Sequence, residues 1–189
     1  MFPPGDDIFV ASADFDFAGS VVLVTGGGSG IGLAITRAFL AAGATVAITG
    51  RPPDRLAEAL AGHPAERTAA LPAEVSDGTQ VARLVADVVD RFGRLDVVVS
   101  NAAGYESGPL TELADDAWER LRATNVDAFF HLAKAALPHL ATSGGNLVAV
   151  SSVSGSAVTG VRPPTTPRRP RSATSSGPSR WTGAPTGCG

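Results

Sequence analysis

The chain has little of several things, and each shortage excludes a class of protein. Its single cysteine, Cys188, allows no internal disulfide, so we expect a reducing, cytoplasmic setting. No apolar run is long enough to cross a bilayer, and residues 1–17 lack the cationic stretch and apolar core of a signal peptide. The net charge of −3 creates no basic field for nucleic acid or anionic lipid. We therefore expect a soluble protein without nucleic-acid or membrane partners.

Apolar segments alternate between two periods along the first 150 residues. Short β-branched runs predict buried strands, and apolar residues at steps of three and four predict amphipathic helices. The strands are expected at residues 21–24, 45–49, 68–75, 95–100 and 146–151, and the helices at residues 30–42, 55–61, 80–92 and 115–140. Strands without polar alternation, each followed by a helix, indicate a parallel sheet covered on both faces. The predicted fold is α/β, a Rossmann-like doubly wound sheet in three α/β/α layers.

The character of the sequence changes after Gly160. Residues 161–189 are dense in Pro, Arg, Ser, Thr and Gly and have no helical or strand period. Such a composition cannot bury an apolar face, so a disordered tail is predicted. The predicted organisation is an N-terminal extension at residues 1–14, a dinucleotide-binding domain at residues 15–160 that is incomplete at its C-terminal edge, and the tail.

A glycine-rich turn lies directly between the first strand and the first helix. Glycines there allow a tight turn and a close approach of the backbone to a pyrophosphate, and the helix N-terminus supplies free N–H groups. A merely tight loop is the other interpretation, but the strand–turn–helix context favours a dinucleotide site. The predicted phosphate-binding residues are Thr25, Gly26, Gly28, Ser29, Gly30, Ile31 and Gly32.

The spacing T-G-x-x-x-G-x-G resembles the short-chain dehydrogenase/reductase family, and further motifs follow in that family's order. Asn101-Ala102-Ala103-Gly104 resembles its N-N-A-G element, with Ala in place of the second Asn. Glu74-Val75 occupies the place of an Asp-Val pair that contacts adenine. Asn125 and Ser152 match a helical Asn and the catalytic Ser. The resemblance covers residues 15–160.

The resemblance implies an NAD(P)-dependent oxidoreductase acting on a small carbonyl or alcohol substrate. Ser152 and Asn125 would be catalytic residues, and Asn101, Ala102, Ala103, Gly104, Glu74 and Val75 would contact the cofactor. Glu in place of Asp at position 74 would loosen the adenine contact. Family members are usually homo-oligomers, and the oligomeric state of this chain stays open.

The end of the second strand carries the signal for cofactor choice. An acidic residue there would accept hydrogen bonds from the ribose 2′-OH and repel a 2′-phosphate, but this chain has Gly50-Arg51. A guanidinium at this place pairs well with phosphate, which favours NADP(H), with NAD(H) as the alternative. A solvated arginine at a helix start is the other interpretation.

The family's Tyr-x-x-x-Lys pair is missing at its expected place. Counting from Ser152, Thr165 and Arg169 occupy the two positions, and neither can act as the general acid/base or its cationic partner. The only tyrosine, Tyr105, is interpreted as a packing residue in preference to a substrate contact. We therefore expect no appreciable turnover from the chain as written. The resemblance also implies that a sixth helix and a sixth and seventh strand are lost, which would leave the strand at residues 146–151 as an exposed sheet edge, so marginal stability is expected.

The genetic code offers an explanation for this gap. Residues 164–170 can be encoded by codons that, read one base earlier, give Ala-Tyr-Asn-Ala-Ala-Lys-Ala, with tyrosine and lysine in place of Thr165 and Arg169. In the same frame Trp181-Thr182 yields an obligatory aspartate, as the family's continuation would have. We hypothesise a one-base frameshift shortly before codon 164, with a genuine alternative tail as the other possibility.

Other polar residues support no additional site. His131 and His139 have no partners at ligand spacing, His63 lies near a loop, and we predict no metal. The arginines of the tail lack the interleaved aromatics of a nucleic-acid interface. Two hypotheses remain: an NADP-dependent oxidoreductase in a damaged copy, and a non-catalytic dinucleotide-binding remnant. A Tyr-x-x-x-Lys pair in the chain would decide for the first.

Overall fold

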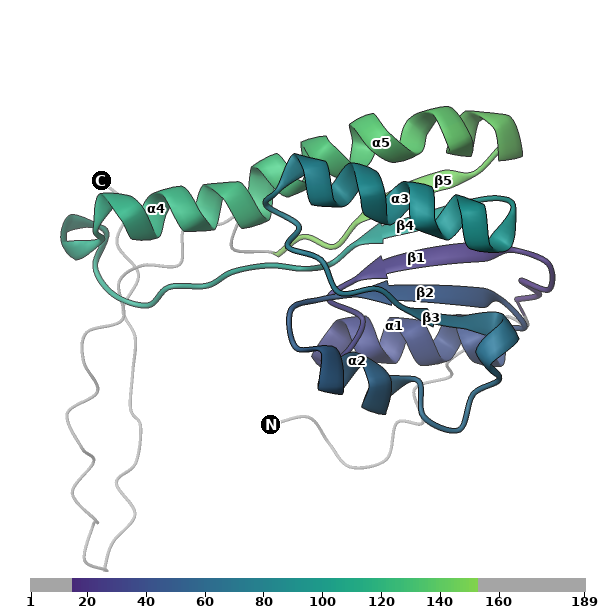
Figure 1. Ribbon diagram of the computed structural model, residues 1–189. Helices are drawn as coiled ribbons and strands as arrows, with labels where there is room; N and C mark the ends of the chain where they lie inside the picture. Colours follow the sequence, from purple (N-terminus) through teal and green to yellow (C-terminus); the bar gives the residue numbers. More distant parts are fainter. Residues whose placement is uncertain (1–14, 153–189) are drawn as a thin grey trace, which may run out of the picture. The chain divides into compact units, whose positions relative to one another are not determined.

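The computed structural model describes residues 15–152, which build one open sheet of five parallel strands (Figure 1). The strands are β1 (Val21–Thr25), β2 (Thr45–Thr49), β3 (Thr68–Ala70), β4 (Val97–Ser100) and β5 (Asn146–Ala149). Their order is β3-β2-β1-β4-β5, and every neighbouring pair is parallel. The predicted doubly wound sheet is confirmed. The extension at 1–14, the end of the domain at 160, the tail and the proposed frameshift lie outside the described residues.

The helices form a layer on each face of this sheet. The longer ones are α1 (Gly30–Ala41), α2 (Pro53–Ala59), α3 (Gly78–Phe92), α4 (Asp115–Arg122) and α5 (Ala128–Ser143), and short turns are η1 (Ala65–Arg67) and η2 (Leu110–Glu112). Figure 1 shows α1 and α2 on one face and α3 and α5 on the other. This is the predicted three-layer α/β/α arrangement. No helix within residues 15–152 is long and apolar enough to cross a membrane.

Successive residues of each central strand face opposite layers, and both layers are apolar. Val22 and Val24 of β1 pack in the cluster of α1 and α2, whereas Leu23 packs in the cluster of α3 and α5. All three are fully buried. A strand covered on both faces needs apolar residues at every position, which explains why the sequence shows no polar alternation there.

The third strand is shorter than predicted. Residues 68–75 were expected to form it, but β3 ends at Ala70. The Leu71 N–H still donates to the Ile48 carbonyl at 2.9 Å, and then Pro72 has no N–H to continue the ladder. The chain leaves the sheet at this point and runs as a loop towards the carboxyl ends of the strands, where it becomes part of the candidate site.

The predicted single helix over 115–140 is wrong in its interior and at its end. A π-helical segment, η3 (Ala123–Asp127), separates α4 from α5, and the Ala128 N–H bonds to the Ala123 carbonyl five residues back. Helix α5 continues to Ser143, where Gly144 with a φ of 70° ends it. Apolar periodicity does not change where one helical turn widens, so η3 is not predictable from the apolar pattern.

Strand β5 is one of the two edge strands among the described residues, and β3 is the other. It pairs with β4, and the Val150 N–H extends the ladder to the Ser100 carbonyl at 2.9 Å. Val148 is 48% exposed, whereas its partner on β4, Val99, is buried. Within the described part of the chain, β5 is therefore an edge strand with an exposed side chain.

Candidate cofactor-binding site

The glycine-rich turn joins β1 to α1 and is bound closely to β2. Gly26 has a φ of 66°, and its N–H donates to the Thr49 carbonyl at 2.8 Å. A Cβ at Gly32 would overlap the Gly26 carbonyl oxygen, and a Cβ at Gly27 would lie 2.6 Å from Cγ2 of Ile48. Helix α1 can therefore start this close to the sheet only with glycine at these positions. Gly27 was not among the predicted site residues, although it belongs to the same motif.

The N-terminus of α1 leaves its N–H groups available. The N-cap is Ser29, whose side chain makes no capping hydrogen bond, and the first turn holds no acidic residue. The first N–H groups of a helix lack partners within the helix and carry a partial positive charge. The start of α1 therefore favours binding of an anion such as a phosphate, because no acidic side chain of its first turn neutralises the N–H groups.

A cleft of about 590 Å³ lies at this end of the sheet. Its lining comes from the turn after β1, the start of α2 after β2, the loop after β3 and the loop after β4. The lining residues are Gly26, Gly28, Ser29, Gly30, Ile31, Gly50, Arg51, Pro52, Arg55, Leu56, Glu74, Val75, Asn101, Ala102, Ala103 and Thr124. The structure thus brings most of the predicted cofactor residues together at the carboxyl ends of the strands (Figure 1).

Three predicted cofactor residues, Thr25, Gly32 and Gly104, are not part of this lining. Thr25 is buried, and its Oγ1 accepts hydrogen bonds from the N–H groups of Asn101 and Ala102, both at 2.9 Å. Asn101 Nδ2 donates to the Thr25 carbonyl at 3.0 Å. These bonds fix the loop after β4 to the end of β1. Thr25 therefore shapes the cleft without lining it, as does Gly32 beneath the turn.

Asn125 and Gly104 also hold the loop after β4 in place. Asn125 Oδ1 accepts from the Gly104 N–H at 2.7 Å, and Asn125 Nδ2 donates to the Gly104 carbonyl at 3.1 Å. Asn125 lies in η3, so the π-helical segment is bonded to the loop after β4. Thr124 of the same segment lines the cleft. A widened helical turn at a binding site is a common feature of π segments.

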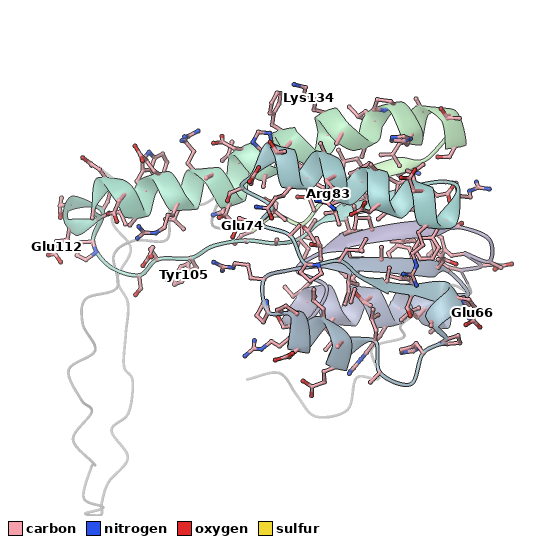
Figure 2. The ribbon with its side chains drawn as sticks, in the orientation of Figure 1. Glu66, Glu74, Arg83, Tyr105, Glu112 and Lys134 are labelled. Atoms are coloured by element: carbon pink, nitrogen blue, oxygen red, sulfur yellow. The ribbon has the colours of Figure 1, made fainter. Side chains whose placement is uncertain are left out.

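The charged side chains that line the cleft among the described residues are Arg51, Arg55 and Glu74. Arg51 Nε lies 4.0 Å from Glu74 Oε2, and the two side chains are 80% and 37% exposed. Figure 2 shows Glu74 at the carboxyl ends of the strands, where the loop after β3 reaches the cleft. Arg55 is not among the predicted site residues. Its position at the start of the helix predicted over residues 55–61, four residues after Arg51, is the signal that could have identified it.

Comparison with known proteins places this site in a family. The model of the short chain dehydrogenase family matches residues 20–163. Over 139 residues the chain is 34% identical to meso-2,3-butanediol dehydrogenase of Serratia marcescens, covering 74% of this chain and 55% of that protein. Over 145 residues it is 40% identical to L-fucose dehydrogenase of Bos taurus, with 74% and 51% covered. The crystal structure of a short-chain dehydrogenase from Streptomyces avermitilis matches with a TM-score of 0.68 at 37% identity, covering 72% and 50%.

The chain belongs to the short-chain dehydrogenase family. It spans about half the length of the curated relatives that it matches. The family is one of NAD(P)-dependent oxidoreductases. The resemblance read from the motifs is confirmed.

The two predicted catalytic residues of this short-chain dehydrogenase lie apart from the cleft lining. Asn125 contacts Gly104 instead, as described above. Ser152 is exposed and follows β5 by three residues, as the last residue that the structure describes. It does not line the cleft formed by the described residues. The assignment of both as catalytic residues stays a prediction.

Tyr105 and His131 both lie outside the cleft lining. Tyr105 is 87% exposed, so its interpretation as a packing residue is wrong within the described part of the chain. The reason is its place in a loop that leaves the sheet beneath α4 (Figure 2). His131 packs against Gly78 at the start of α3, where a Cβ would lie 2.8 Å from its Nδ1. The described residues contain no group of three or more His, Cys, Asp or Glu that could hold a metal.

Proposed function

We propose that the chain binds NADP(H) in the cleft and acts in hydride transfer between that cofactor and a small carbonyl or alcohol substrate. The observation that carries the proposal is the uncapped N-terminus of α1 beside a turn in which Gly27 and Gly32 leave no room for a Cβ. A volume of about 590 Å³ also falls within the roughly 300–1,000 Å³ usual for cofactor and ligand pockets. The residues present therefore fit a dinucleotide.

Each wall of the cleft has a role in this proposal. Gly28, Ser29 and Gly30 would hold the pyrophosphate through their backbone at the α1 N-terminus. Val75 would contact the adenine, and Ala102 and Ala103 the nicotinamide ribose. The cofactor itself supplies the hydride chemistry when bound. What the chain adds is binding and orientation, for which the bonds of Thr25 and Asn125 keep the loop after β4 in place.

Arg51 and Arg55 support NADP(H) over NAD(H). Both line the cleft beside the end of β2, where the adenosine ribose of a dinucleotide lies in this fold. An arginine pairs with a phosphate in a bidentate way, and this contact is absent with a 2′-OH. The names of the two relatives refer to a diol and a sugar, which supports a hydroxyl-bearing substrate.

We further propose that the chain as written turns over no substrate appreciably. In the sequence, Thr165 and Arg169 stand where the family's tyrosine and lysine are expected, and an aliphatic hydroxyl is a much weaker acid than a phenol. The second candidate function is a non-catalytic dinucleotide-binding protein. The absence of a Tyr-x-x-x-Lys pair from the sequence favours it for this chain.

Binding and turnover separate these proposals. Titration calorimetry with NADP⁺ and NAD⁺ on the full chain should show a preference of about tenfold or more for NADP⁺, the effect of one charged hydrogen-bond pair. Arg51→Ala should remove most of this preference. Arg83→Ala is the matched control, because Arg83 is 85% exposed and also lies 4.0 Å from a carboxylate, that of Asp87, but on α3. Binding of neither dinucleotide would refute the function, and NADPH oxidation with simple aldehydes would refute the inactivity.

A further inference from the structure

The carboxylate of Glu74 is held in place by its own loop. Glu74 Oε1 accepts hydrogen bonds from Ser76 Oγ at 3.1 Å and from the Ser76 N–H at 3.4 Å. The Glu74 N–H donates to Gln80 Oε1 at 3.0 Å, and Gln80 Nε2 donates to Asp77 Oδ2 at 3.0 Å. One oxygen of Glu74 is thus occupied within the loop, and the other, Oε2, is the one that lies 4.0 Å from Arg51.

In the proposed site, Arg51 would interact with two anionic groups, the Glu74 carboxylate and the 2′-phosphate of the cofactor. It follows β2 and Glu74 follows β3, so the two side chains come from neighbouring strand ends and line one cleft. A 2′-phosphate bound by Arg51 would bring a second negative group next to a carboxylate that already lies 4.0 Å from the guanidinium nitrogen Nε. Both side chains are partly exposed, so their attraction is weak enough to be displaced.

We propose that Glu74 limits the selectivity of the cleft for NADP(H) by competing with the 2′-phosphate for Arg51. The inference rests on the proposed function and deepens it. NAD(H) has no 2′-phosphate for the carboxylate to compete with, and the carboxylate could accept a hydrogen bond from the ribose 2′-OH. Arg55 adds a second cation to the lining, so the three charged residues sum to one net positive charge, and removal of the Glu74 charge doubles it.

The test is Glu74→Gln in the full chain, because glutamine keeps an oxygen acceptor for Ser76 and removes the charge. Titration calorimetry should show NADP⁺ binding roughly fivefold tighter, the effect of releasing the Arg51 guanidinium from a partly exposed ion pair. Binding of NAD⁺ should be unchanged or weaker. Adenosine 2′,5′-bisphosphate should follow NADP⁺, which assigns the gain to the 2′-phosphate.

Glu66→Gln is the matched control for net charge. Glu66 is exposed in η1, and Figure 2 shows it at the opposite end of the sheet from Glu74. Its substitution changes the same unit of charge and should leave the ratio of NADP⁺ to NAD⁺ affinity unaltered. An equal gain in Glu66→Gln would overturn the inference, because the effect would then belong to the whole charge of the chain.

A double-mutant cycle with Arg51→Ala decides the mechanism. If Glu74 acts by occupying Arg51, the gain from Glu74→Gln should disappear in the Arg51→Ala background. The same gain in both backgrounds, or no gain in either, overturns the inference while the binding of NADP⁺ by the unaltered chain leaves the proposed function standing. Failure of the unaltered chain to bind either dinucleotide overturns both. Should Glu74→Gln not fold, Glu74→Asp withdraws the carboxylate by one methylene and should give a gain of about twofold.

Discussion

Asn125 and Gly104 are bonded to each other twice, through the side-chain oxygen at 2.7 Å and the side-chain nitrogen at 3.1 Å. The pair joins the π-helical segment η3 to the loop after β4. Ala102 and Ala103 of that loop line the cleft, and Asn125 does not. Asn125 therefore positions a wall of the cleft through Gly104.

Asn125→Ala should loosen this wall. Both hydrogen bonds are lost, so the Gly104 amide should exchange with solvent several-fold faster, and NADP⁺ should bind a few-fold more weakly. Amide exchange followed by NMR, together with calorimetry, measures the two effects. Val126→Ala is the control in the same segment, because Val126 is 61% exposed. An unchanged Gly104 exchange rate in Asn125→Ala would show that the loop is held by other contacts.

Thr25→Val should destabilise the fold by roughly 2 kcal/mol, because the N–H groups of Asn101 and Ala102 both lose their acceptor. Thr25 is buried, and valine has nearly the same shape without the hydroxyl. Thr25→Ser keeps the oxygen and loses one methyl group, so its cost should stay below about 1 kcal/mol. Urea unfolding of the three proteins measures the difference. Equal stability of the valine and serine variants would contradict the role given to the hydroxyl.

The fold was predictable because its signals are local and redundant. Val22, Leu23 and Val24 form an unbroken apolar run that only a strand covered on both faces accommodates. The glycine turn was predictable for a similar reason. Gly26 has a positive φ, and Gly32 has no room for a Cβ, so the backbone at both positions requires glycine. Features of this kind restrict the residue type at single positions, so they can be predicted from the sequence.

Features that depend on pairs of distant residues were not predictable. The widening at Asn125 accompanies its bonds to Gly104, which lies 21 positions away. The contact of Arg51 with Glu74 depends on how the loop after β3 leaves the sheet, and Pro72 determines that departure. Pro72 was visible in the sequence and should have ended the predicted third strand. The missing N–H outweighs the apolar pattern there, and β3 ends at Ala70.

Stability should fall in acid partly because of Asp96. Burial on its own raises the pKa of this carboxyl, but hydrogen bonds from Arg94 and from the Val21 N–H outweigh burial and hold the pKa below its ordinary value of 3.8. A depressed folded-state pKa means that the contribution is complete above the unfolded-state value and is lost as the pH falls through the folded-state value.

Asp96→Asn should therefore be less stable than the unaltered chain at neutral pH, and the difference should shrink below pH 3.8. Thermal unfolding along a descending pH series measures it. Asp90→Asn, on the exposed face of α3, serves as the control and should run parallel to the unaltered chain. A constant difference between Asp96→Asn and the unaltered chain at every pH would mean that packing, and not charge, is what the substitution removes.

The gene itself tests the explanation given for the missing catalytic pair. Resequencing across codons 155–189 should reveal one additional base before codon 164, and translation should then give tyrosine and lysine in place of Thr165 and Arg169. The corrected protein should reduce small carbonyl compounds with NADPH, because the general acid and its cationic partner would be present. If the codons stand as the present sequence requires and exclude that frame, the frameshift hypothesis is wrong. The chain would then be a dinucleotide-binding protein without this family's proton donor, and its affinity for NADP⁺ would be the property to explain.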